Sequence, residues 1–152
     1  MGEAKRIAEQ HRRAYHGEAW HGPSVFETLR GVTAAAAAKR PIAQAHTIWE
    51  LVLHLTSWER IVCSRVEGEV IEDSRALDWP AMPRPTATAW REARAALEAA
   101  ADELRMAIAR MTDRKLQTKR AGATRTYYDL VHGQVQHALY HAGQIALLRK
   151  GR

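Results

Sequence analysis

The chain has 152 residues, which is enough for one domain with a hydrophobic core, and we expect a single domain over residues 1–152. Its one cysteine, Cys63, excludes an intramolecular disulfide. No stretch approaches the ~20 apolar residues that a membrane span needs. The composition therefore predicts a cytoplasmic protein with no membrane partner.

The net charge of +6 allows two interpretations, an anionic partner or a solvated basic surface. Acidic and basic residues alternate through most of the chain, which favours the second. The exception is residues 114–125, where Lys115, Lys119, Arg120 and Arg125 occur without an acid, as in a short basic loop. No stretch interleaves basic and aromatic residues as a single-stranded nucleic-acid platform does. We therefore predict a small-molecule substrate and no nucleic-acid partner.

The first half of the chain predicts three helices. A short polar helix is expected over residues 3–16, and it would cross or extend the helix that follows. That next helix is expected over about 24–38, from a capping box at its start to the proline at position 41. A second capping box, Thr47 with Glu50, begins a helix that ends near residue 68.

The second half predicts two longer helices joined by loops. Residues 69–85 hold three prolines and are expected to form a helix-free crossover. A helix over about 86–111 would present a seam of bulky residues and alanines in a seven-residue repeat, namely Trp90, Leu97, Leu104, Met111, Ala93, Ala100 and Ala107. A loop over 112–125 leads into a last helix over 126–149. The pattern predicts an all-α four-helix bundle with a long crossover and a short N-terminal helix.

Polar residues occupy helix faces where a core requires hydrocarbon. In the last helix one face carries Leu130, Gln134, His137, His141, Gln144 and Leu148, and apolar residues border it. In the 47–68 helix, His54 falls within an otherwise mostly apolar stripe. Buried polar groups without partners cost ~1–3 kcal/mol each, so these side chains must find partners. The five remaining histidines are expected at polar ends, in loops or off this face, namely His11, His16, His21, His46 and His132.

Two interpretations of His54, His137 and His141 remain open from spacing alone. They are hydrogen-bonded core residues, or they bind one metal ion and leave its fourth position open, as catalytic sites do. Glu50 lies one turn before His54 and could accept a hydrogen bond from its ring, or serve only in the capping box. Gln144, with Gln134 and Tyr140, would orient a substrate.

The runs HTIWELVLHLTSWE (46–59) and HGQVQHALYHAGQIALLRK (132–150) resemble the DinB/YfiT-like family of small metal-dependent helical bundles. The segments WHGPSVFETLRG and DWPAMPRPTATAW are similar to the same family, so the resemblance covers essentially the whole chain. It implies a four-helix bundle with a long crossover, often a homodimer. It also implies one divalent cation, zinc or nickel, on His54, His137 and His141.

Relatives of known activity in this family include thiol-cofactor S-transferases and a maleylpyruvate isomerase. The resemblance thus implies a metal-dependent transferase or hydrolase in which the metal activates a thiol or water, with a low-molecular-weight thiol as a further cofactor. The alternative is a non-catalytic, metal-stabilised binding or association protein. Similar sequences often carry an acid where this chain has Ala138. That position lies about 100° from His137 on the helix, so its loss should spare the metal but remove any contact made by the acid.

Overall fold

The computed structural model describes residues 1–72 and 74–151, and regular structure in these ranges is helical except for one isolated β-bridge between Lys119 and Thr126. The helices are α1 (Glu3–His16), α2 (Val25–Leu29), α3 (Ala34–Ala38), α4 (Ile48–Glu67), α5 (Arg75–Asp78), α6 (Ala87–Arg110), α7 (Asp113–Leu116) and α8 (Tyr127–Lys150). In the described residues, no helix is both long enough and apolar enough to cross a membrane.

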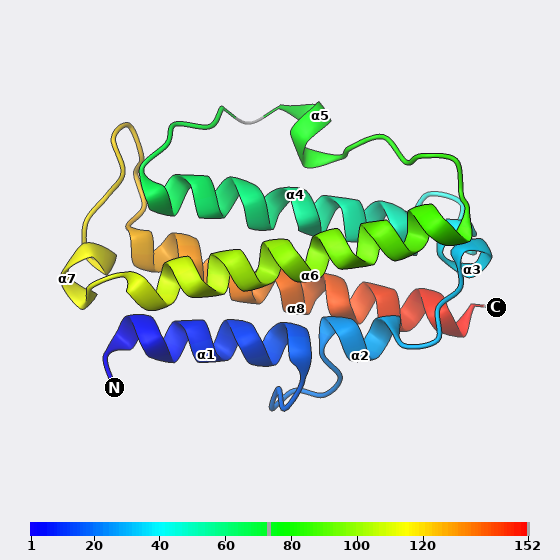
Figure 1. Ribbon diagram of the computed structural model, residues 1–152, viewed down its shortest axis with the longest axis horizontal. Coiled ribbons are helices and arrows are strands. Elements are labelled where there is room, and N and C mark those ends of the chain that lie inside the picture. Colours follow the sequence, from blue (N-terminus) through cyan, green and yellow to red (C-terminus); the bar gives the residue numbers. More distant parts are fainter. Residues whose placement is uncertain (73, 152) are drawn as a thin grey trace.

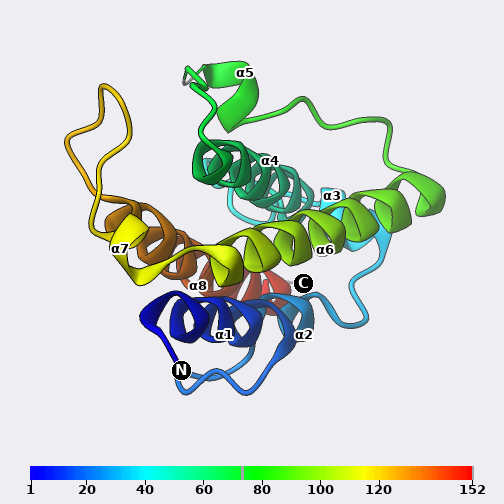
Figure 2. The same cartoon turned by 60° about the vertical axis from the view of Figure 1, so that its left-hand side comes forward.

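Four helical columns form the bundle, and the predicted all-α bundle is confirmed. Helix α6 packs on α1 and α4, and α8 packs on the same two helices from the other side. Figure 1 shows α1 and α2 following one another along one edge, so together they form one column. The long crossover from α4 to α6 carries α5 over the outer side of α4 (Figures 1 and 2).

The predicted helix over 24–38 is wrong in its extent, because the chain forms two one-turn helices there. The capping box at its start is present, with Ser24 accepting from the Glu27 backbone N–H. Arg30 then leaves the helix, and Gly31 adopts φ +73°, a left-handed conformation that glycine tolerates without a side-chain clash. Thr33 begins α3 as a new cap. The first column of the bundle is therefore α1, extended by α2.

Two expected loops each contain one helical turn. Helix α5 lies within the crossover over 69–85, and α7 lies within the loop over 112–125. Each begins at a hydroxyl cap, where Ser74 accepts from the backbone of Leu77 and Thr112 from that of Lys115. A single turn has no measurable 3.6-residue period, which is why the sequence pattern did not predict it.

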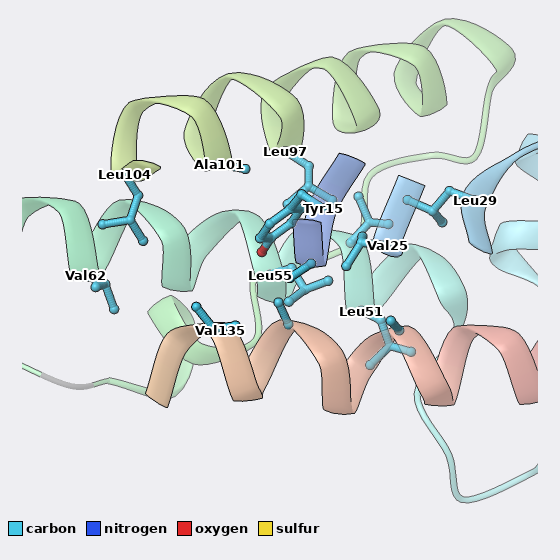
Figure 3. Packing of buried hydrophobic residues seen from close by; sticks show 14 of the residues in the cluster. Tyr15, Val25, Leu29, Leu51, Leu55, Val62, Leu97, Ala101, Leu104 and Val135 are labelled. Carbon is cyan, nitrogen blue, oxygen red and sulfur yellow. The ribbon is translucent and has the colours of Figure 1, made fainter. Parts of the chain in front are cut away.

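The core fills the space between the columns, as Figure 3 shows for part of it. The seven-residue seam of α6 faces inward as predicted, with Leu97 and Leu104 fully buried. Trp49 and Leu55 of α4 are also fully buried. This packing fixes how α4 and α8 face one another, and those two helices carry the predicted histidines.

Candidate metal centre

The three predicted histidines lie together between α4 and α8. The Nε2 atom of His137 lies 3.0 Å from Nε2 of His54 and 2.9 Å from Nε2 of His141. One nitrogen from each ring falls within 4.8 Å of the others, so the three could hold a metal ion. Nitrogens that share one zinc ion tetrahedrally stand ~3.3 Å apart, because each lies ~2.05 Å from it. The two Nε2–Nε2 distances are about 0.3–0.4 Å shorter than this spacing, so a small outward shift of the rings would admit the ion.

The outer nitrogens show which atoms carry the protons. His54 donates from Nδ1 to the Asp78 carbonyl oxygen at 2.6 Å, and His141 donates from Nδ1 to Gln144 Oε1 at 2.7 Å. Both rings then present an Nε2 lone pair to His137. A neutral His137 has one proton, which can satisfy at most one of these lone pairs, and its own Nδ1 is buried without a partner in the described residues. A cation at the centre would satisfy all three Nε2 atoms.

Burial keeps these imidazoles neutral. The pKa of His137 falls from 6.5 to about 3, first because of desolvation and then because of its two histidine neighbours. Desolvation also lowers the pKa of His54 and of His141, although each has a hydrogen bond that acts in the opposite direction. Neutral imidazole is the form that binds metal ions, so the site is ready for a cation near neutral pH.

The crossover holds His54 in place, a role that the sequence did not reveal. The Trp79 ring stacks on the His54 ring with centroids 4.0 Å apart and planes 12° from parallel. Trp58 Nε1 donates to Asp78 Oδ1 at 2.7 Å, and Ser57 Oγ donates to the Leu77 carbonyl. The run DWP was visible in the sequence, but no local pattern shows which helix a crossover touches.

Of the residues singled out as support for the site, Glu50 does not reach the histidines and Gln144 does. Glu50 does not contact His54, because its carboxylate caps the Thr47 backbone at 2.7 Å and pairs with Arg40 at 2.8 Å. Gln144, expected to orient a substrate, accepts a hydrogen bond from His141 Nδ1 at 2.7 Å.

Tyr140 and Ala138, the two other positions discussed from the sequence, lie on opposite sides of α8. Tyr140 is 66% exposed, and its ring centroid lies 5.1 Å from that of His141 with the ring planes 70° apart. Ala138 is fully buried in the core, so an acid at this position would lose its hydration in this chain.

A second polar cluster lies deeper in the bundle and centres on Glu59, which is fully buried on α4. Its carboxylate accepts from Tyr15 Oη at 2.6 Å and Gln134 Nε2 at 2.7 Å, and its other oxygen lies 2.8 Å from His11 Nε2. Burial, followed by the neighbouring carboxylate, raises the pKa of Tyr15 well above its usual value. The expected polar-end position of His11 is therefore wrong. Gln134 belongs to this network and also lines the cavity described next.

A cavity of about 660 Å³ opens beside the histidines, with His54 and His137 among its lining residues. Its lining residues come mainly from α4, α8 and the loop that leads from α7 into α8. Volumes of ~300–1,000 Å³ are typical of small-molecule sites. The predicted basic loop contributes Arg120 and Arg125 to the lining, and α4 contributes Arg65.

A family model described as the DinB superfamily matches residues 20–145, a range that includes all three histidines. Comparison with curated proteins and with solved structures found no match.

Proposed function

The chain belongs to the DinB superfamily, and on that premise we propose that it is a metal-dependent enzyme acting on a small molecule. His54, His137 and His141 would hold one divalent cation, with zinc or nickel as the first candidates. One observation carries the proposal: three Nε2 atoms converge while two of the outer nitrogens donate away from the centre.

The chemistry follows from the donor set. A divalent cation on three imidazoles acts as a Lewis acid that lowers the pKa of a fourth ligand, either water or a thiol, and so supplies a nucleophile near neutral pH. The cavity beside His54 and His137 supports access by a small molecule. Transfer to sulfur and hydrolysis are two reaction classes that use such a nucleophile. The thiol cofactor and the homodimer implied by the family resemblance belong to this proposal.

The chain's own residues would orient the imidazoles. The Asp78 carbonyl and Gln144 Oε1 keep the Nδ1 protons of their partners outward, which leaves Nε2 as the ligand atom. The Trp79 ring covers one face of His54 and excludes water from it. Tyr140 lies at the exposed edge of His141, where its hydroxyl could reach a bound substrate.

The test is metal content per chain, measured on protein purified without a histidine tag. Wild type is expected to hold about one equivalent, and His141→Ala to lose it. His132→Ala is the matched control, because this histidine lies on the same helix, outside the cluster and stacked on Tyr128. Circular dichroism checks that each variant keeps its helices.

Three results would count against the proposal. Wild type that takes up no zinc, nickel or cobalt, with its helices intact, would reduce the cluster to a hydrogen-bonded polar core. Full metal content in both His54→Ala and His141→Ala would place the ion elsewhere. A site that binds cobalt but admits no exchangeable ligand would favour the non-catalytic alternative, a metal-stabilised binding or association protein.

A further inference from the structure

Three arginines and two aspartates line the cavity beside the histidines. Arg65 enters it from α4, and Arg120 and Arg125 enter from the loop before α8. Arg65 is 6% exposed, is held by a hydrogen bond to the Ile71 carbonyl at 3.0 Å, and lies over the Trp58 ring at 5.7 Å. One guanidinium is thus fixed within the wall, while two come from the loop.

The Trp58 ring connects the arginine side of the cavity to the histidines. Its centroid is 5.9 Å from the His137 ring and 5.7 Å from the Arg65 guanidinium carbon. All three side chains line the same cavity. A small molecule lying along Trp58 can therefore contact the histidine cluster and the guanidinium of Arg65 together.

The two carboxylates that line this cavity already have partners. Asp78 accepts from Trp58 Nε1, and Asp129 Oδ2 accepts from the backbone and hydroxyl of Thr126 at 2.9 and 2.7 Å. The guanidinium groups of Arg120 and Arg125 form no hydrogen bond or close ion pair with another residue that the structure describes, whereas the Arg120 carbonyl accepts from the Ala123 backbone. Three guanidinium groups against two carboxylates give the lining an excess of positive charge, although Arg125 also lowers the pKa of Asp129 through its charge, after the Thr126 hydrogen bonds.

We propose that this cavity binds its ligand through a carboxylate or phosphate group, held by Arg65, Arg120 and Arg125. The proposal deepens the proposed function and rests on it, because it assigns the substrate class of the same site: a small oxyanion-bearing molecule whose other end reaches the histidines. Guanidinium groups suit this role, since their planar fork matches two oxygens of a carboxylate or phosphate.

The size of the cavity favours a small molecule over a nucleic-acid backbone. Its volume is that of a ligand pocket, and its arginines converge on one space. Binding of a nucleic-acid backbone needs basic residues spaced along an extended surface. Its affinity falls steeply as the salt concentration rises, because many phosphates are neutralised at once. A single bound oxyanion would show only a modest weakening as salt rises.

The experiment measures binding of succinate and of inorganic phosphate to metal-free protein by isothermal titration calorimetry, with uncharged succinamide as the matched probe. We expect at least one of the two anions to bind about tenfold more tightly than succinamide. Arg120→Gln and Arg125→Gln should each weaken that binding about threefold to tenfold. Arg84→Gln removes an exposed arginine outside the cavity and should leave it unchanged.

The preferred anion separates the carboxylate and phosphate classes. Succinamide binding as tightly as both anions, or unchanged affinity in both cavity variants, would overturn the proposal. Arg125 is exposed, so its replacement is not expected to disturb the fold. Because the measurement omits the metal, it separates the two hypotheses. Anion binding by protein that never takes up metal would refute the proposed function alone, whereas metal uptake without anion preference would refute this inference alone.

Discussion

Acidification should destabilise the metal-free protein through His137. Its pKa is about 3 in the folded protein against 6.5 for an unperturbed histidine, because the folded site desolvates the ring and sets two imidazoles beside it. As the pH falls, the unfolded chain takes up a proton first. The stability linked to His137 is therefore complete above pH 6.5 and is lost progressively between pH 6.5 and 3.

The magnitude follows from the shift. In this window the unfolded chain carries the proton and the folded chain does not, so each pH unit costs about 1.4 kcal/mol. Between pH 7 and pH 5 the loss from this one group is about 2 kcal/mol. His54 and His141 also have lowered pKa values and act in the same direction. Against a total stability of ~5–15 kcal/mol for a domain, this effect is readily measurable.

The assay is urea unfolding of chelator-treated protein at pH 7 and pH 5, for wild type, His137→Gln and His21→Gln. Glutamine keeps a neutral polar side chain at position 137. On acidification from pH 7 to pH 5, the unfolding free energy of this variant should therefore fall by about 2 kcal/mol less than that of wild type. His21→Gln removes an exposed imidazole and should behave as wild type. Equal losses in wild type and His137→Gln would show that the site does not repel a proton, and the argument from desolvation would fail.

Two further predictions concern the core. Glu59→Ala removes the shared partner of Tyr15, His11 and Gln134. Urea denaturation should show that the free energy of unfolding falls by about 3–5 kcal/mol. A fall of less than about 1 kcal/mol would mean that the network adds no stability. Leu97→Ala, at a fully buried position, should cost about 2–5 kcal/mol. The control is Met106→Ala, at a 44% exposed position on the same helix, and its unfolding free energy should stay within about 0.5 kcal/mol of wild type. Equal costs for the two variants would contradict the observed packing.

Helix periodicity predicted the metal candidates because their positions depend on one helix at a time. His137 and His141 are one turn apart on α8, and His54 interrupts an apolar stripe on α4, so each is visible as a polar residue on an inward face. Their convergence needed only that the two inward faces meet. The structure brings them together in this way, with Nε2 contacts of 3.0 and 2.9 Å.

The partners of those histidines were not predictable by the same reasoning. Glu50 had the right helical spacing to reach His54, but its capping box and Arg40 engage it. The partner is the Asp78 carbonyl, a backbone atom that has no residue-type signature. Glu59 was equally hidden, because its partner His11 lies in α1, a short helix that was expected to cross or extend the first bundle helix and for which no contact with the 47–68 helix was predicted.

The predicted cluster therefore has one rigid half and one adjustable half. His137 and His141 share a helix, so the α8 backbone alone fixes their spacing, and Gln144 locks one ring from the same helix. His54 reaches them only through the packing of α4 on α8, and its ring is held by the Asp78 carbonyl and by Trp79, which lie in the crossover. Any ligand or contact that shifts the crossover would act on His54 first. The position of the third donor therefore depends on the crossover between α4 and α6, whereas the α8 pair is set within one helix.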